Sequence, residues 1–170
     1  RYTGKILAGH LDYQETLVGY QQAFYQLVKK YGIPMKLVSD KRTVFTYKRI
    51  ASNSETAKLT QFGYMAEKLG MEMYCTPTPQ EKPMVEKANG ILQDRLTASF
   101  SLLGDNMTIE KANELLESLI DEINEALGYT EDGLDNAFEQ YNEDRFGPLD
   151  LMLSVRETRQ MANGFVFSYH

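Results

Sequence analysis

The pattern of apolar and polar positions in the first forty residues predicts a strand, a helix and a second strand. Lys5–Leu11 is typical of a strand that leaves a Thr-Gly turn. Within Asp12–Tyr31 the apolar residues recur with the helical period, and Gly32 predicts the end of that helix. A short apolar run, Met35–Val38, then predicts a buried strand that ends on Asp40. Such a unit normally closes as a parallel, right-handed crossover.

The alternation of helix and strand continues into the following residues. Small and polar residues over 50–58 predict a loop. A short helix is expected over Leu59–Leu69, ended by Gly70, and a further strand over Met71–Thr76. The sequence therefore predicts an α/β fold with a substantially parallel sheet.

A helix with a clear start follows. Thr78–Glu81 is a capping box with proline at the first helical position. The apolar stripe expected to pack consists of Met84, Val85, Ala88, Leu92 and Leu96. Glu86 falls on a polar face that it shares with Lys82, Asn89 and Gln93. We therefore expect Glu86 to project beside the core contact.

The last part of the chain is acidic. Thr108 caps a long helix that Gly128 ends, and its outer face carries Glu110, Glu114, Glu117, Asp121 and Glu125. An acidic linker with one short helix is expected over 129–148. Two strands, Leu151–Arg156 and Gly164–Tyr169, predict that residues 149–170 begin a small C-terminal β domain.

Composition is that of an ordinary soluble globular domain. The chain has 170 residues, of which 42% are hydrophobic and 25% charged, enough for one domain with a core. It shows no apolar run long enough to span a bilayer and no signal peptide. A single cysteine, Cys75, fits a reducing, cytoplasmic setting. The start at Arg1, within a strand-turn-strand pattern, is interpreted as that of a fragment.

Charge is divided unevenly along the chain. Residues 1–100 hold 14 Lys and Arg against 9 Asp and Glu, a balance of +5, whereas residues 101–170 hold 4 against 15, a balance of −11. The basic part could face phosphates, because basic patches supply most non-specific affinity for nucleic acid. Charge alone, however, is explained more simply by two solvated faces.

Two carboxylates are candidates for chemistry. Asp40 ends a predicted strand, and the space beyond the carboxyl ends of strands is where open α/β sheets bind ligands. Bases follow at Lys41, Arg42, Lys48 and Arg49. Glu86 lies 46 positions later on a polar helix face. Spacing alone favours a turn-forming aspartate and a solvated glutamate over a metal site.

Several local stretches resemble insertion-sequence transposases of the ISNCY group. The stretch Val38–Phe45 resembles the segment around the second aspartate of their Asp-Asp-Glu triad, and Thr76–Lys87 resembles the capped helix that bears the last acid. Further similar stretches are Thr60–Tyr64, Gln93–Leu96, Met107–Asn113 and Leu149–Tyr169. The order of elements also resembles the second half of a retroviral-integrase core.

The resemblance implies an RNase H-like (integrase core) fold that is incomplete at its N-terminal strands. Residues 1–128 would be the catalytic core, and residues 149–170 the start of a small C-terminal β-barrel. Asp40 and Glu86 would hold two Mg²⁺ (or Mn²⁺) ions for phosphoryl transfer. The first aspartate of the family lies upstream of the segment that Arg1–Lys5 resembles, so this chain is expected to bind metal weakly and not to catalyse strand transfer.

The resemblance also implies partners. Double-stranded DNA, as transposon ends and target, would be contacted by basic residues: Lys41, Arg42, Lys48, Arg49, Lys82 and Lys87. Exposed sheet edges would favour a homo-oligomer, and the setting would be the cytoplasm, with the nucleoid. Tyr47 lies between basic residues and could stack on a nucleobase. His10 and Cys75 are interpreted as packing residues.

Two alternatives stay open at this point. One is a non-catalytic remnant that acts in DNA binding or self-association, with the acidic helix 108–127 as its interaction surface. The other is an RNase H-like nuclease with the same metal chemistry. A preference for duplex ends over RNA–DNA hybrids would separate a transposase from the nuclease.

Overall fold

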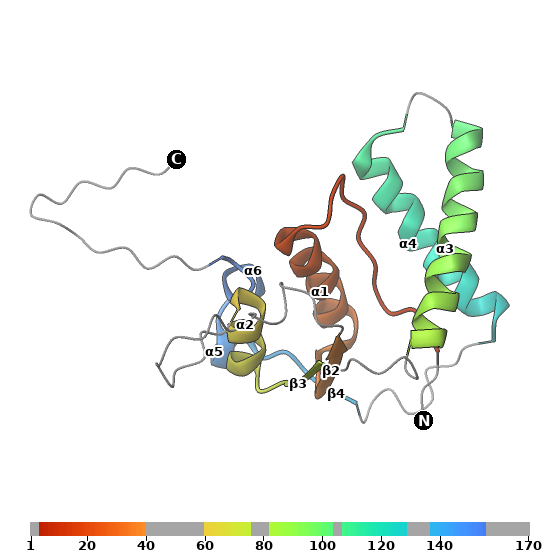
Figure 1. Ribbon diagram of the computed structural model, residues 1–170. Coiled ribbons are helices and arrows are strands. Elements are labelled where there is room, and N and C mark those ends of the chain that lie inside the picture. Colours follow the sequence, from red (N-terminus) through yellow and green to blue (C-terminus); the bar gives the residue numbers. More distant parts are fainter. Residues whose placement is uncertain (1–3, 40–59, 76–81, 104–106, 129–136, 156–170) are drawn as a thin grey trace, which may run out of the picture.

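A computed structural model describes residues 4–39, 60–75, 82–103, 107–128 and 137–155 of the chain (Figure 1). Helices predominate, and the strands of the described residues form two small two-stranded sheets. The expected mixed α/β class is confirmed at this level, while the RNase H-like fold and the C-terminal barrel stay predictions. None of the helices in these ranges is both long and apolar enough to cross a bilayer.

Helix α1 (Leu17–Tyr31) lies between a threonine cap and a glycine. The Thr16 hydroxyl accepts a hydrogen bond from the Gly19 amide at 2.9 Å, which starts the helix later than the predicted Asp12. At the other end Gly32 has a φ of 100°, and a side chain there would collide with the carbonyl oxygen of Glu139. The predicted stop at Gly32 is confirmed.

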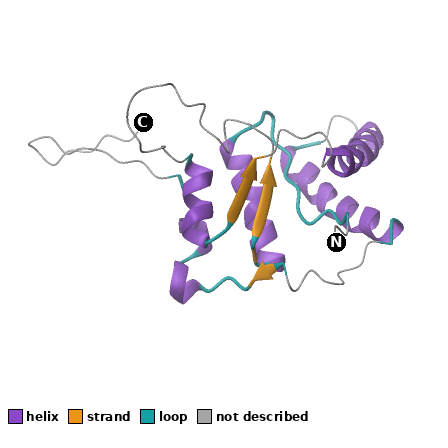
Figure 2. Cartoon of the chain, turned by 60° about the horizontal axis from the view of Figure 1, so that its bottom comes forward, coloured by secondary structure: helices purple, strands orange, loops and turns teal. Residues whose placement is uncertain are grey.

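The strand that leads to Asp40 has a parallel partner, as a parallel sheet requires, but this partner is the next strand along the chain and not the predicted strand Lys5–Leu11. β2 (Lys36–Ser39) pairs in parallel with β3 (Glu72–Cys75), and α2 (Gln61–Leu69) lies between them in the chain (Figure 2). The end of α2 at Gly70 is as predicted. The sheet leaves one face in contact with the core and the other open, because alternate side chains of each strand are exposed.

A first hydrophobic cluster packs around α1 and α2. The short antiparallel pair of β1 (Ile33–Pro34) and β4 (Phe138–Glu139) brings the later part of the chain onto it. Phe24 and Phe62 meet edge to face at its centre, with ring centroids 5.5 Å apart. The buried members are Phe24, Val28, Ile33, Phe62, Met65, Ala66, Leu69, Met71, Leu149 and Leu153.

The described chain between β4 and residue 155 is helical where a strand was expected. α5 (Glu143–Phe146) is the short helix predicted for the linker, and α6 (Leu149–Met152) follows directly after Pro148. Leu149 and Leu153 are both buried in the first cluster, and their spacing of four residues suits one side of a helical turn. The prediction of a strand from Leu151 is therefore wrong as far as residue 155. The second expected strand lies outside the described residues.

A second hydrophobic cluster lies between the two long helices. α3 (Lys82–Leu103) and α4 (Ile109–Ala126) pack side by side, as Figure 1 shows. The cap predicted at Thr108 is confirmed, because its hydroxyl accepts from the Lys111 amide. The buried members of this cluster are Leu96, Leu116, Leu119 and Ile120.

The prediction of a strand over Lys5–Leu11 is wrong. This segment is extended, but within the described residues it pairs with no strand. Two asparagine side chains of α4 bond to its backbone instead, Asn124 at Ile6 and Asn113 at Leu11. Because backbone donors and acceptors need partners of any kind, side chains can take the place that a neighbouring strand would fill.

Candidate metal and nucleic-acid site

The two strands of the parallel sheet end at the same edge. Ser39 of β2 is the register partner of Cys75 of β3, and Asp40 is the next residue of the chain after Ser39. Asp40 itself lies outside the described residues, as do Lys41, Arg42, Lys48 and Arg49. The structure therefore describes the strand that leads to the first candidate carboxylate.

The second candidate carboxylate lies on α3. Glu86 is exposed in the first part of this helix, and Lys87 beside it is exposed as well. Asn89 and Gln93 are also exposed, whereas Leu96 is buried against α4, so the predicted polar and packing faces of the helix are confirmed where side chains are described. Lys82 is the first residue of α3, and its side chain is not among those described.

The side chains near Glu86 can be examined as possible ligands of a metal ion. Among the described residues, no three His, Cys, Asp or Glu side chains come together as a metal-binding group. Glu86 is exposed and offers a carboxylate, which is the type of ligand that Mg²⁺ prefers. A site at this edge would need Asp40 and further oxygen ligands beside Glu86.

One charged group beside the strands was missed in the sequence. Lys36 and Glu72 form an ion pair at 3.2 Å across β2 and β3. The hydrogen bond from Lys36 lowers the pKa of the Glu72 carboxyl, and the same bond raises the pKa of the Lys36 ammonium. Lys36 is thus engaged by a carboxylate at the amino end of β2, far along the strand from Asp40. Opposite charges at the starts of two predicted parallel strands would have indicated this pair.

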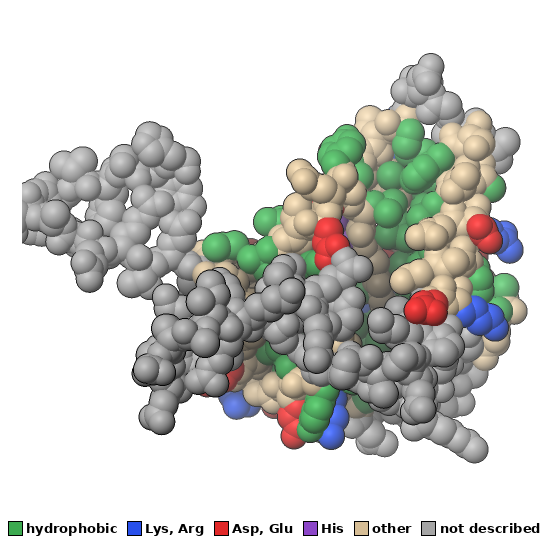
Figure 3. Space-filling model, in the orientation of Figure 1, with side chains coloured by type: hydrophobic (Ala, Val, Ile, Leu, Met, Phe, Trp, Pro, Cys, Tyr) green, Lys and Arg blue, Asp and Glu red, His purple; other side chains and the backbone are tan. Residues whose placement is uncertain are grey.

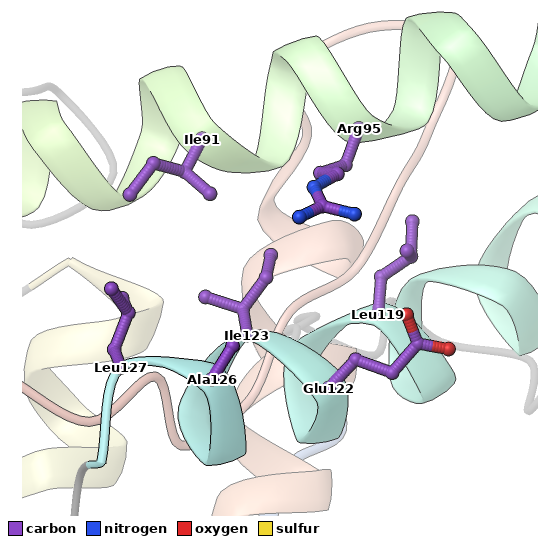
Figure 4. Close-up of a pocket in the computed structure, with 7 residues that line it drawn as sticks. All are labelled: Ile91, Arg95, Leu119, Glu122, Ile123, Ala126 and Leu127. Carbon is purple, nitrogen blue, oxygen red and sulfur yellow. The ribbon is translucent and has the colours of Figure 1, made fainter.

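A pocket of about 270 Å³ lies between α3 and α4 (Figure 4). Its wall is mostly apolar, and Arg95 points from α3 toward α4, where Glu122 lies. The full lining is Ile91, Arg95, Leu119, Glu122, Ile123, Ala126 and Leu127. Figure 3 shows that apolar side chains also gather along the seam between these helices.

The outer face of α4 is acidic, as predicted. Its exposed acids are Glu110, Glu114, Glu117, Asp121, Glu122 and Glu125. One of them, Asp121, pairs with Lys30 of α1 at 3.3 Å. A face with this charge repels the phosphates of nucleic acid.

The chain is 42% identical over 129 residues to the transposase for insertion sequence IS1202 from Streptococcus pneumoniae, an alignment that covers 74% of this chain and 27% of that protein. The chain is related to insertion-sequence transposases. It is also 29% identical over 171 residues to a putative transposase, y4bF, from Sinorhizobium fredii (strain NBRC 101917 / NGR234), covering 98% of this chain and 36% of the relative.

This similarity supports the resemblance of the sequence to insertion-sequence transposases. The chain spans about a third or less of the length of these curated relatives. No protein-family model and no solved structure matches it. The Asp-Asp-Glu triad, and with it the roles of Asp40 and Glu86, stays a prediction.

Proposed function

We propose that this chain is part of a transposase core that performs metal-dependent cleavage and transfer of DNA strands, with Asp40 and Glu86 as two of its metal-binding carboxylates. The relation to insertion-sequence transposases is the observation that carries this proposal. It favours a metal-binding role for Asp40 and Glu86, which their spacing alone did not distinguish from ordinary surface residues.

Two features of the described residues support these positions. β2 ends at Ser39 in register with the end of β3, so Asp40 follows at the carboxyl edge of the parallel sheet. That edge is the usual place for ligands in open α/β folds. Glu86 is exposed on the polar face of α3, so its carboxylate is accessible to a cation from solvent.

The proposed cofactor is a pair of Mg²⁺ (or Mn²⁺) ions. Carboxylate oxygens are suitable ligands for both ions, so Asp40 and Glu86 fit them by chemical type. When bound, such ions activate the attacking water or 3′-hydroxyl and stabilise charge on the leaving oxygen. The contribution of the chain itself is to hold the two acids in place and to supply positively charged side chains that contact the flanking phosphates.

The proposed partner is double-stranded DNA, as transposon ends and target. Lys87 is exposed next to Glu86, so it can meet a phosphate beside the proposed site. The other proposed contacts are Lys41, Arg42, Lys48, Arg49 and Lys82. A homo-oligomer is part of the proposal, because the open strand edges of small sheets favour association between chains.

Mn²⁺ binding tests the two acids directly. We expect Asp40→Asn and Glu86→Gln each to weaken Mn²⁺ binding, followed by the paramagnetic resonance signal of the free ion. Glu117→Gln is the matched control, because Glu117 is an exposed acid of α4 with no proposed role. Equal Mn²⁺ affinity in all four proteins would exclude a metal site at Asp40 and Glu86.

DNA cleavage distinguishes the proposal from the two alternatives. The intact transposase should nick or join duplex ends only with Mg²⁺ or Mn²⁺, and Glu86→Gln in that protein should abolish the reaction, whereas this chain by itself is not expected to catalyse it. An RNase H-like nuclease would prefer RNA–DNA hybrids under the same conditions. In the non-catalytic alternative the acidic face of α4 would be a surface for assembly, and metal and Glu86→Gln would leave DNA binding unchanged.

A further inference from the structure

The strand before the first proposed metal ligand and the helix that carries the second belong to different packing units of the molecule. β2, which leads to Asp40, packs on the first cluster through Leu37, whereas α3, which carries Glu86, packs on the second. The two clusters share no buried residue among those described. The distance between the carboxylates therefore depends on what joins these units.

The extended segment 4–16 is one such connection. It rises between α4 and α1, as Figure 1 shows, and then enters α1 through its cap. Ile6 and Leu11 pack against the second cluster, while the residues after them belong to the start of the helix in the first. The segment therefore spans the space between the two units.

Two asparagines of α4 form hydrogen bonds with this segment at two points. The Asn124 side chain accepts from the Ile6 amide at 2.9 Å and donates to the Ile6 carbonyl at 2.8 Å. The Asn113 side chain accepts from the Leu11 amide at 2.8 Å and donates to the Leu11 carbonyl at 3.0 Å. Each asparagine thus satisfies both backbone groups of one residue, as a paired strand would do.

The spacing of the two asparagines matches the spacing of the residues they hold. Asn113 and Asn124 are 11 positions apart in a helix, which is a rise of about 16 Å. Ile6 and Leu11 are five positions apart in an extended chain, which is also about 16 Å. The segment runs opposite to α4, so Ile6 meets the later asparagine and Leu11 the earlier one.

Between these two pairs of hydrogen bonds, the segment packs closely against α4. Gly9 lies between them, and a methyl group on it would come within 3.1 Å of both Ile120 and Leu116. Asn124 is itself only 5% exposed, so its bonds to Ile6 are shielded from water. The segment is held along its length and not only at its ends.

The connection continues into α1 through a short run of hydrogen bonds. Directly after Leu11, the Asp12 carboxylate accepts from the Tyr13 amide at 2.8 Å and from the Thr16 hydroxyl at 2.9 Å. Thr16 is also the cap of α1. Few residues therefore separate Leu11, which Asn113 holds, from the start of α1 in the other unit, and hydrogen bonds form among those few residues.

We infer that Asn113 and Asn124 are positioning residues for the proposed metal site. They clamp the pair of α3 and α4 to the segment that enters α1, and this sets where Glu86 lies relative to the end of β2. The part of the inference that concerns metal rests on the proposed function. The part that concerns the clamp does not, and the two are tested separately.

The clamp is tested by distance and by amide exchange. Spin labels at Glu67→Cys in α2 and Ala98→Cys in α3, in a chain with Cys75→Ser, report the separation of the two units from exposed sites. Asn124→Leu keeps the side-chain size and removes both bonds, and Asn113→Ala is a milder second variant. We expect a shifted or broadened distance distribution and roughly tenfold faster exchange at the Ile6 or Leu11 amide.

A matched control and a contrary result complete this test. Ser118→Ala removes an exposed side-chain hydrogen bond within α4 and should change neither readout. Circular dichroism establishes that each variant keeps its helices. An unchanged distance distribution in both folded asparagine variants would overturn the clamp.

Mn²⁺ affinity then tests whether the clamp acts through Glu86. We expect Asn124→Leu to weaken Mn²⁺ binding about two- to tenfold, and to have no further effect once Glu86→Gln is present. The same loss of affinity in both backgrounds would overturn the positioning role. If Glu86→Gln alone leaves Mn²⁺ affinity unchanged, the proposed function fails, and the clamp is still decided by the distance measurement.

Discussion

Lys36 and Glu72 are register partners in the parallel pair of β2 and β3, and their side chains form an ion pair at 3.2 Å. The Tyr74 hydroxyl donates to the same carboxylate oxygen at 3.1 Å, and the Lys36 ammonium lies 5.3 Å from the centre of the Tyr74 ring. A shift of register by one residue would separate the charges and turn every side chain to the other face. The pair therefore helps to specify the alignment of the strands that lead to Asp40.

We expect Glu72→Gln to make stability less sensitive to acid. The hydrogen bond from Lys36, followed by that from Tyr74, lowers the pKa of the Glu72 carboxyl. A lowered folded-state pKa gives stability that is present above the unfolded pKa and is lost as pH falls through the folded value. The melting temperature should therefore fall slightly less in the variant between neutral pH and about pH 3. The effect is small because both side chains are exposed.

Two further variants complete that measurement. Glu67→Gln, at an exposed position of α2, should keep the acid sensitivity of the unmodified chain. Lys36→Met should reduce acid sensitivity as Glu72→Gln does, and the double variant should show no additional change. Identical acid profiles for Glu72→Gln and the unmodified chain would show that the ion pair contributes nothing in solution.

Gly32→Ala should destabilise the chain strongly. The φ of 100° at Gly32 is a conformation that costs other residues about 1–3 kcal/mol. A methyl group would also meet the Glu139 carbonyl, so the pairing of β1 with β4 would have to open. We expect a loss of at least about 2 kcal/mol in denaturant unfolding. Gly70→Ala is the comparison, because it has a φ of 74° but no atom within 4 Å, and should cost less.

Gly90→Ala should have the opposite sign. Gly90 lies inside α3, and a methyl group on it would meet no atom within 4 Å. Alanine in a helix interior is favoured over glycine by about 1 kcal/mol, so we expect a stability gain of that order in denaturant unfolding. A loss of stability instead would indicate that this glycine has a contact or a bend that the described helix does not contain.

Sequence patterns predicted the positions of the elements from α1 through β3 well, because their signals are local, but β2 is not the buried strand that its apolar run predicted, since Met35 and Val38 are exposed. Capping residues, glycine stops and short apolar runs lie within a few positions of the elements that they define. The exposure of Glu86 followed in the same way from the polar face of one helix. Asp40 could be placed after a strand, but its distance from Glu86 depends on contacts between units, which no local pattern contains.

The two wrong strands have physical explanations. Ile6 and Leu11 find their partners in asparagines more than a hundred positions away, and nothing in the periodicity of the segment indicates them. Leu151–Arg156 has an apolar run that suits a strand or a buried helical turn equally well. A helical turn buries both Leu149 and Leu153 in the first cluster, which explains why this segment is helical.

Substitutions in α6 test whether this short helix is part of the core that surrounds α1. Leu153 is 5% exposed and packs in the first cluster, whereas Leu151, two residues earlier, is 69% exposed. Truncating a buried leucine to alanine typically costs about 2–5 kcal/mol, through lost burial and the cavity left behind. We expect Leu153→Ala to lower the stability of the whole unit by such an amount, with Leu151→Ala nearly neutral. Unfolding should be followed at α1, for example by amide exchange of Phe24. If Leu153→Ala leaves the protection of Phe24 intact, α6 does not stabilise the core around α1.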